Sequence, residues 1–337
     1  MRFSNIFIPD ELIASEPLLK RDECRLLCLE KNTGNIKHML FKDVVEFFKD
    51  GDLLVFNNTK VVNARLYVSK TTGGAVEILL LRPATYPNWR CLIKGKNIKK
   101  GTILKINDTD ILVEVSVVDD GHYEVKFPDS TDVLLLMEKV GQIPLPPYIK
   151  RDPVQSDYEM YQTVFAKEKG SVASPTASLH FTDDLINKIK DKGVSVHFVT
   201  LHVGYGTFSP VRDPDTHVMH EEFFSFDKNL EGAISKCKNS GGRVWAVGTT
   251  VVRTLESAFD DDLHVERTSG WSNLFIKEPY KFKVIDCMIT NFHHPSTSLM
   301  YLVSAFAGED RIIKSYNDAV SKKYRMLSYG DAMAIIR

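Results

Sequence analysis

The chain has 337 residues, with 43 Lys and Arg, 44 Asp and Glu, and a formal net charge of −1. Its 43% hydrophobic and 26% charged residues are typical of a globular protein of roughly two domains. No apolar run approaches the roughly 18 residues that span a bilayer, no signal-peptide pattern opens the sequence, and the five cysteines form no CxxC pair. These features argue against a membrane protein, a disulfide scaffold and a zinc ribbon, and we expect a cytoplasmic protein with free thiols.

The first half of the chain predicts strands followed by a small barrel. Residues 25–30 alternate as a strand, 42–49 suggest a helix, and GDLLVFN predicts a second strand. Between residues 65 and 127, six short alternating segments are separated by Gly, Asn and Asp turns. Closely spaced strands without a helical period predict a small antiparallel β-barrel, which closes its own edges. A helix at 131–140 and the stiff IPLPPYIKR segment follow, which suits a domain boundary.

The second half alternates helices with buried strands. Residues 182–193 have an N-cap and a C-terminal glycine, and further helices are predicted at 227–239, 249–259, 297–308 and 310–324, with strands at 194–201, 243–248 and 282–292. The expected fold is therefore an α/β (mixed α+β) main domain, residues 1–64 and 148–337, interrupted by a small antiparallel β-barrel domain, residues 65–147.

Histidines recur in polar segments rich in Gly, Thr and Ser. SVASPTASLHFT carries His180, VTLHVGYGTF carries His202, and later segments carry His220, Glu222 and His293. Since functional side chains gather on loops, these segments predict one site assembled from several loops. Taken singly, each histidine could instead be a core residue bonded to a backbone carbonyl.

A strand, Gly-Thr-Thr and a helix follow one another at residues 243–259, a shape that presents free backbone N–H groups to a polar or anionic ligand. Arg253, one turn into that helix, could clamp a carboxylate or form an ion pair with Glu256. The segment HVMHEE invites a metal reading, but its spacing is not HExxH and the following FFSFD predicts a strand, so no metal site is expected.

Charge is distributed unevenly along the predicted barrel. Ten Lys and Arg lie between Lys60 and Lys105 against the single acid Glu77, whereas residues 106–140 carry nine acids against two lysines. Such a stripe can attract a phosphate backbone, or it can be the solvated face of a hairpin. The candidate nucleic-acid contacts are five lysines of KGKNIKKGTILK: Lys94, Lys96, Lys99, Lys100 and Lys105.

Ordered segments along the whole chain resemble the S-adenosylmethionine:tRNA ribosyltransferase-isomerase family. They include GDLLVFNNTKVVNARL, TGGAVEILLL, GQIPLPPYIKR, SVASPTASLHFT, VTLHVGYGTFSPV, MHEE, VGTTVVRTLES, ITNFHHPSTSL and YRMLSYGDAM. The resemblance implies an α/β domain interrupted by a small barrel. It also implies an enzyme of queuosine biosynthesis that transfers and isomerises the ribosyl part of S-adenosylmethionine onto 7-aminomethyl-7-deazaguanine at the tRNA wobble position. The products are epoxyqueuosine-tRNA, adenine and methionine.

The resemblance also assigns candidate roles to residues. A base must remove a C5′ proton acidified by the sulfonium, adenine needs a proton or hydrogen bond as it leaves, and the attacking amine must be neutral. By similarity the acid/base candidates are His180, His202, His220, Glu222 and His293, and the residue that acts as the base is left open. The candidates for holding methionine and ribose are Thr176, Thr207, Thr249, Thr250, Arg253 and Asn291. No cofactor beyond S-adenosylmethionine is implied, and a monomer that binds tRNA is expected.

Several positions depart from the usual pattern of that family. This chain has Ser178 where the family commonly has glycine, and His294 and Ser296 replace its usual leucine and lysine. These departures leave open a paralogue that performs the same chemistry on another acceptor, such as a free deazapurine. A third possibility from another class is a non-catalytic RNA-binding protein that uses the basic barrel.

Overall fold

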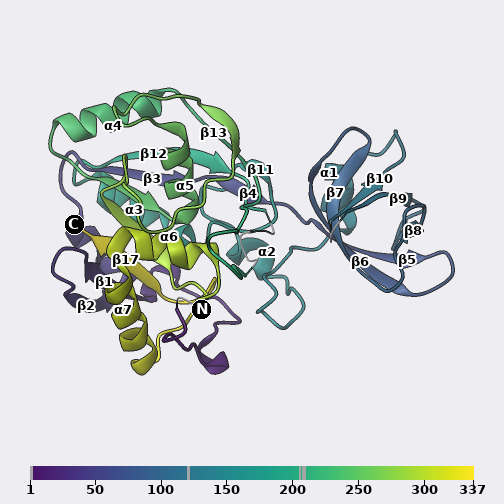
Figure 1. Cartoon of the computed structure of the whole chain (residues 1–337), viewed down its shortest axis with the longest axis horizontal. Helices are drawn as coiled ribbons and strands as arrows, with labels where there is room; N and C mark the ends of the chain where they lie inside the picture. The colour runs from purple at the N-terminus through teal and green to yellow at the C-terminus, as the bar shows by residue number, and fades with distance from the viewer. Residues whose placement is uncertain (1–2, 120–121, 205, 207–209) are drawn as a thin grey trace.

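The computed structural model describes residues 3–119, 122–204, 206 and 210–337. Its main body is built on a mixed nine-stranded sheet, and the chain leaves this body to form a separate barrel before returning (Figure 1). The strand order in the sheet is β15 (Ser269–Ser272), β13 (Glu222–Phe226), β12 (Ser195–Leu201), β3 (Leu53–Asn57), β14 (Val244–Val247), β16 (Cys287–Asn291), β17 (Ala332–Ile336), β1 (Arg25–Glu30) and β2 (Ile36–Leu40).

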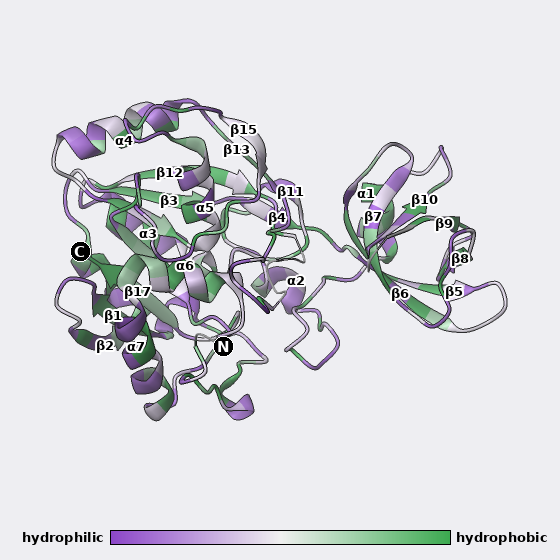
Figure 2. Cartoon of the chain, viewed as in Figure 1, coloured by the Kyte–Doolittle hydropathy of each residue, from purple (hydrophilic) through white to green (hydrophobic). Residues whose placement is uncertain are grey.

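Helical segments cover both faces of this sheet, so its central strands are buried throughout. Alternate residues serve the two cores: Leu53 and Val55 point to one, Leu54 and Phe56 to the other. The first core is closed by α4 (Asn229–Asn239), α5 (Thr249–Ala258), α6 (Ser298–Ala307) and α7 (Glu309–Ser321); the second by α3 (Asp183–Lys190) and the 3₁₀ helices η3 (Phe41–Phe47) and η4 (Thr176–His180). Green hydrophobic segments therefore concentrate in the middle layer of Figure 2.

The barrel is closed and antiparallel. Its strand order is β10 (His122–Lys126), β7 (Asn88–Lys94), β6 (Ala75–Pro83), β5 (Arg65–Lys70), β8 (Ile103–Ile106) and β9 (Leu112–Asp119). Helix α1 (Val133–Val140) follows, capped by the Asp132 carboxylate, which accepts from the Leu135 N–H. Inward residues such as Leu66, Val68 and Ile78 form a core of their own. The predicted fold class, α/β with a small antiparallel barrel, is confirmed.

The barrel leaves the body through a short parallel ribbon of β4 (Thr59–Val61) and β11 (Glu168–Ser171). Because β4 directly follows β3, this ribbon lies at the carboxyl end of β3. The remaining short elements are η1 (Asp10–Leu12), η2 (Arg21–Glu23) and α2 (Asp157–Met160). The segment predicted as a helix at 42–49 is the 3₁₀ helix η3. Phe41 and Val44 are three residues apart and both pack into the core, so the spacing of apolar residues resembles that of an α-helix.

Candidate active site

Four neighbouring strands, β12, β3, β14 and β16, run parallel. Their carboxyl ends therefore lie at one edge of the sheet, which is where α/β proteins bind ligands. His202 follows β12, Gly248 follows β14, and Asn291 ends β16. This shared direction explains how segments far apart in the sequence reach one region.

Asn57, the last residue of β3, ties these strand ends together. Its amide nitrogen donates to the Leu201 carbonyl at 3.0 Å and to the Thr250 hydroxyl at 3.2 Å. Its amide oxygen accepts from the backbone N–H groups of Thr59 and Leu201, each at 3.1 Å. A buried amide with all these bonds satisfied fixes the relative positions of β3, β12 and the start of α5.

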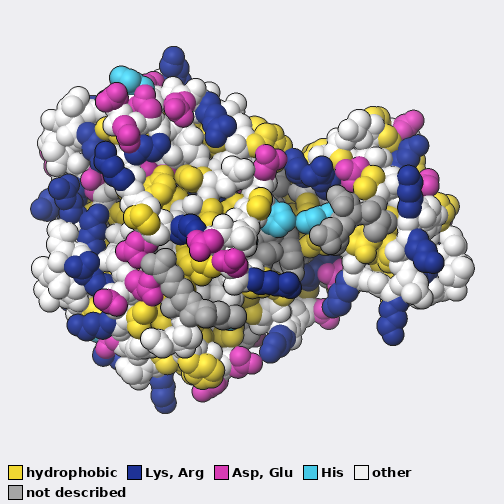
Figure 3. Space-filling model, in the orientation of Figure 1, with side chains coloured by type: hydrophobic (Ala, Val, Ile, Leu, Met, Phe, Trp, Pro, Cys, Tyr) yellow, Lys and Arg dark blue, Asp and Glu magenta, His cyan; other side chains and the backbone are white. Residues whose placement is uncertain are grey.

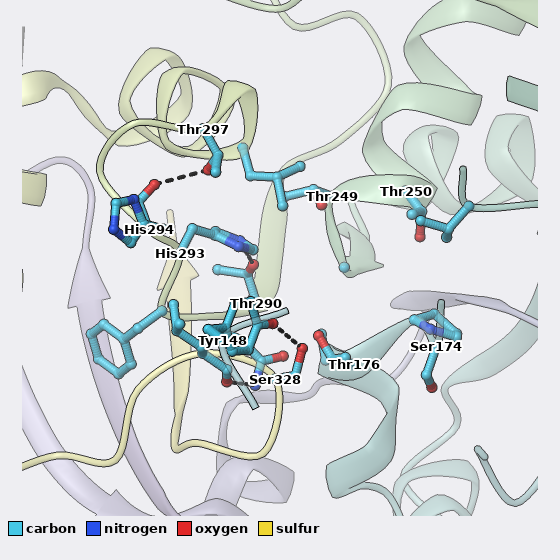
Figure 4. Close-up of a pocket in the computed structure, with 18 residues that line it drawn as sticks. Tyr148, Ser174, Thr176, Thr249, Thr250, Thr290, His293, His294, Thr297 and Ser328 are labelled. Atoms are coloured by element: carbon cyan, nitrogen blue, oxygen red, sulfur yellow. Dashed lines mark hydrogen bonds between the residues drawn. The ribbon is translucent and has the colours of Figure 1, made fainter. Parts of the chain in front are cut away.

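A pocket with a cavity volume of about 70 Å³ lies at this edge, between the first turns of α5 and α6 (Figure 4). Gly248, with φ of 91°, turns the chain from β14 into α5, and Thr297 is the N-cap of α6. Of the predicted methionine- and ribose-holding residues, four line this pocket: Thr176, Thr249, Thr250 and Asn291. Two helix starts and several hydroxyls suit a polar or anionic ligand.

Unpaired polar atoms mark the wall of this pocket. The Oδ1 atom of Asn291 and the hydroxyl of Ser174 are buried and have no hydrogen-bond partner among the described residues. The other side of the Asn291 amide is engaged, because its nitrogen donates to the Leu327 carbonyl at 3.2 Å and contacts His180 Nε2 at 3.1 Å. Since a buried polar atom without a partner costs free energy, these two atoms are available to a ligand in the pocket.

His293 also lines the pocket. Its Nε2 lies 2.7 Å from the Thr290 hydroxyl, and its backbone N–H donates to the Tyr316 hydroxyl at 2.6 Å. Burial lowers the pKa of His293 to about 3, so the ring is neutral at physiological pH. His294 and Ser296, which depart from the family pattern, bond to each other at 2.8 Å, and His294 belongs to the pocket wall.

His180 lies behind this wall, beside a separate small hollow of about 20 Å³. Its Nδ1 contacts the Cys24 thiol at 3.2 Å and its Nε2 contacts Asn291. Burial, with a smaller contribution from the positive charge of Arg325, lowers the pKa of His180 to about 3. Both ring nitrogens are thus engaged by protein atoms, and this neutral ring supports Asn291 rather than facing the pocket. Ser178, the other nearby departure, has a buried hydroxyl without a partner among the described residues.

A larger cleft, with a cavity volume of about 800 Å³, separates the barrel from the main body. Histidine side chains (cyan) are visible at this waist in Figure 3. Three predicted acid/base candidates line the cleft: His202, His220 and Glu222. The barrel contributes aromatic and basic residues, including Trp89, Arg82, Arg90 and His122. Val203 lines both the cleft and the pocket, so the two hollows adjoin.

His202 is held by the ribbon that leads into the barrel. The Thr59 hydroxyl lies 2.8 Å from His202 Nδ1 and also contacts the Glu168 carbonyl at 3.4 Å. Gly170 packs so closely that a Cβ there would lie 2.9 Å from His202 Nε2, so only glycine fits beside this ring. Burial lowers the pKa of His202. Because the Thr59 hydroxyl donates its proton to the Glu168 carbonyl, it accepts a hydrogen bond from His202 Nδ1–H. The neutral ring then carries its free lone pair on Nε2.

Two aromatic contacts cross the cleft. The His122 ring of the barrel lies 5.3 Å from that of His220 in the body, and the Arg82 guanidinium lies 4.4 Å from the centre of the Trp271 ring. Trp271, on the edge strand β15, is 42% exposed. Exposed aromatic and basic side chains are the groups on which nucleobases stack.

Arg253, predicted to hold the methionine or ribose, is paired with a carboxylate of the protein. It forms a buried ion pair with Glu222, whose carboxylate also accepts from the Gly204 N–H at 2.8 Å. The alternative pairing with Glu256 is wrong, because Glu256 accepts instead from backbone N–H groups of residues 283–285. Thr207, another predicted ligand-holding residue, lies outside the described residues. Within the described part, no group of three His, Cys, Asp or Glu is arranged to hold a metal ion. The strand expected after HVMHEE is β13, which begins at Glu222.

The five candidate lysines lie on the barrel at β7, the following turn and β8. Lys96, Lys99 and Lys100 are exposed. Lys105 pairs with Asp110 at 3.3 Å, and Lys94 lines a different groove from the cleft. The basic turn is thus available to a polyanion, whereas the positive charge of Lys105 is partly neutralised by Asp110.

The predicted residues therefore gather at one edge but in separate hollows. His202 and His220 line the cleft, His293 the adjoining pocket, and His180 a hollow behind it, so the histidines do not line one pocket. Sequence reasoning missed the organising Asn57 and Thr59 and the cleft residues Arg82 and Trp271. The pair of asparagines that ends a buried strand in LLVFNN was the available signal for Asn57; nothing local singled out Trp271.

Comparisons with known proteins agree along the chain. The family model described as queuosine biosynthesis protein matches residues 5–335. An S-adenosylmethionine:tRNA ribosyltransferase-isomerase of Clostridioides difficile is 45% identical over 97% of both chains, and one of a Sulfurihydrogenibium species is 48% identical over 98% of this chain and 97% of its own. The crystal structure of a Thermotoga maritima S-adenosylmethionine tRNA ribosyltransferase covers 100% of both chains with 35% identity and a TM-score of 0.57.

Proposed function

This chain belongs to the queuosine biosynthesis protein family, and we propose how its site performs the family's reaction. The enzyme is an S-adenosylmethionine:tRNA ribosyltransferase-isomerase. It transfers and isomerises the ribosyl part of S-adenosylmethionine onto 7-aminomethyl-7-deazaguanine at the tRNA wobble position. Adenine and methionine leave, and the attacking amine loses one proton. We propose that S-adenosylmethionine is the only co-substrate, that no metal is required, and that the enzyme acts as a cytoplasmic monomer.

The adjoining pocket and cleft carry this proposal. The pocket is small, lined by hydroxyls and helix starts, and suits the amino-acid part of S-adenosylmethionine. The cleft, at about 800 Å³ against about 70 Å³ for the pocket, is far larger; it is lined by Trp89, Trp271 and Arg82 and suits a nucleotide extruded from the anticodon loop. Because Val203 belongs to both walls, a co-substrate in one hollow and an acceptor base in the other can meet.

We assign proton removal from C5′ to His202. It lines the cleft, its neutral form is favoured by burial, and Thr59 at Nδ1 orients the ring with Nε2 as acceptor. His180 is unsuited to this role because both of its nitrogens are engaged, and Glu222 because it is bound to Arg253. His220, on the same cleft, is available to assist the departure of adenine or to keep the attacking amine neutral.

Burial also contributes to the chemistry by keeping other groups uncharged. His293 borders the pocket with its pKa lowered to about 3, so it brings no positive charge near the sulfonium. A cationic ring there would repel the co-substrate in a site of low dielectric. The single positive centre that activates C5′ is therefore that of the co-substrate itself.

An assay of adenine release tests the function. The full chain is incubated with S-adenosylmethionine and one of three acceptors: tRNA bearing the aminomethyl precursor, unmodified tRNA, or the free deazapurine. Release with precursor-bearing tRNA alone supports the proposal, release with the free base supports the paralogue, and no release supports a non-catalytic RNA-binding protein. A parallel reaction in EDTA tests the metal-free chemistry, since activity lost in EDTA and restored by zinc or magnesium would overturn it.

A further inference from the structure

The orientation of one buried amide determines what the pocket can recognise. The Leu327 backbone carbonyl only accepts hydrogen bonds, so the atom of Asn291 that faces it must be the amide nitrogen. The same nitrogen approaches His180 Nε2, which then serves as an acceptor. The amide cannot turn over without setting its oxygen against the Leu327 carbonyl. The position of Asn291 Oδ1 as a hydrogen-bond acceptor is therefore fixed. The residue is only 2% exposed, and this oxygen has no hydrogen-bond partner among the described residues.

Two helix starts border the same pocket. The first turns of α5 and α6 contribute Thr249, Thr250 and Leu299 to the wall, and the first N–H groups of a helix have no partner inside it. Both helices also place the positive ends of their dipoles here. The pocket thus combines a fixed acceptor on one side with donors and positive potential on the other.

We propose that this pocket reads the amino-acid end of S-adenosylmethionine by charge, with the ammonium on Asn291 Oδ1 and the carboxylate at the starts of α5 and α6. This inference rests on the proposed function and adds to it the orientation of the ligand. An α-amino acid presents both charges from one carbon, so the two sides of the pocket are engaged together. The neutral amide supplies an acceptor without a negative charge that would compete with the carboxylate for the helix starts.

A consequence is that the product methionine binds this pocket without the nucleoside. The probes are L-methionine, its deaminated analogue 4-(methylthio)butanoate, and methioninol, which lacks the carboxylate. Calorimetric titration of the full chain should show each analogue binding roughly 10- to 100-fold more weakly than methionine, the effect of losing a hydrogen bond to a charged group. If the deaminated analogue binds as tightly as methionine, the ammonium contact is wrong, and if methioninol does, the carboxylate contact is wrong. The absence of methionine binding would overturn both contacts.

The variant Asn291→Ala localises the ammonium contact. It should bind methionine and the deaminated analogue with nearly equal affinity, while discrimination against methioninol persists. Ser304→Ala is the matched control, because the Ser304 hydroxyl is also buried and without a partner among the described residues, but lies within α6 away from the pocket wall. Its preferences should equal those of the wild type. If Asn291→Ala still binds methionine more tightly than the deaminated analogue by the wild-type factor, the inference is wrong.

The inference and the proposed function fail separately. Adenine release by the wild type together with unchanged discrimination in Asn291→Ala would reject only the orientation of the ligand. Selective methionine binding without adenine release from precursor-bearing tRNA would reject only the function.

Discussion

Arg253 and Glu222 form an ion pair in which each side chain is only 3% exposed. The pair joins α5 to the start of β13, and Glu222 also holds the Gly204 backbone beside the cleft. The sequence resemblance suggested Arg253 for ligand binding and Glu222 for proton transfer, but in the structure their charged groups pair with each other. In this structure the pair fixes part of the wall of the cleft.

Removal of one partner of this pair should be more damaging than removal of both. Arg253→Met or Glu222→Leu alone leaves a buried charge uncompensated and should lower the free energy of unfolding by about 3–5 kcal/mol. The double variant should recover most of that loss. Urea unfolding of the four proteins measures the coupling, and strictly additive losses would contradict a functional pairing of the two charges.

The pH dependence of turnover tests the role of His202. Burial lowers its pKa, so its neutral, proton-accepting form persists below the ordinary histidine value of about 6.5. The acidic limb of kcat/KM should therefore fall below about pH 6.5, and His202→Gln should reduce kcat strongly with that limb removed. An acidic limb above that value, or full activity in His202→Gln, would exclude His202 as the base.

Trp271 should matter for tRNA and not for the co-substrate. Trp271→Ala removes the exposed ring that Arg82 contacts across the cleft, and should weaken tRNA binding by about 1–3 kcal/mol, the value of one base-stacking contact. Methionine affinity should be unchanged. Tyr86→Ala is the control, since Tyr86 is an exposed aromatic of the barrel that does not line the cleft. Equal effects of the two variants on tRNA would contradict a specific stacking site.

The basic turn of the barrel should bind phosphates. Replacement of Lys96, Lys99 and Lys100 by alanine should weaken tRNA binding and flatten its salt dependence by up to about three units of slope, with little effect on turnover at saturating tRNA. A triple alanine variant of the exposed lysines Lys188, Lys190 and Lys236 on the main body controls for net charge. Unchanged affinity at low salt in the first variant would identify the turn as a solvated hairpin.

Buried neutral histidines should make the fold sensitive to acid. The pKa of His180 is lowered to about 3, so below about pH 6.5 the unfolded chain binds a proton that the folded chain does not. Stability from this residue is complete above pH 6.5 and falls by about 2 kcal/mol between pH 7 and pH 5. His180→Phe keeps a ring beside Phe41 and should remove that share of the pH dependence, measured by urea unfolding at both pH values. An unchanged slope would mean that His180 is protonated in the folded state.

Regular patterns allowed the fold to be predicted. The alternation of residues 65–127 specifies six strands of the barrel, and Thr182 as N-cap locates the start of α3. The strand β17 was missed because its residues AMAII have no polar alternation, being buried on both faces. Segment 42–49 was predicted as a helix because a 3₁₀ turn with two buried apolar residues resembles one at this length.

The site was predicted less completely, because local sequence does not encode which polar groups meet. Asn291 was found through its motif, but its fixed orientation depends on Leu327 and His180, which lie far from it in the chain. The pairing of Arg253 with Glu222 rather than with the helical neighbour Glu256 likewise depends on how β13 packs against α5. Trp271 joins the cleft only because the barrel folds back towards β15.

Mass spectrometry of the wobble nucleoside follows the transfer of the ribosyl group itself. Precursor-bearing tRNA is incubated with the enzyme and S-adenosylmethionine labelled with ¹³C in the ribose, digested to nucleosides and analysed alongside the released adenine and methionine. Every ribose carbon should appear on the aminomethyl-deazaguanine nucleoside, with one adenine and one methionine released per modified tRNA. Labelled ribose that remains with adenine, or a wobble nucleoside without label, would contradict this transfer.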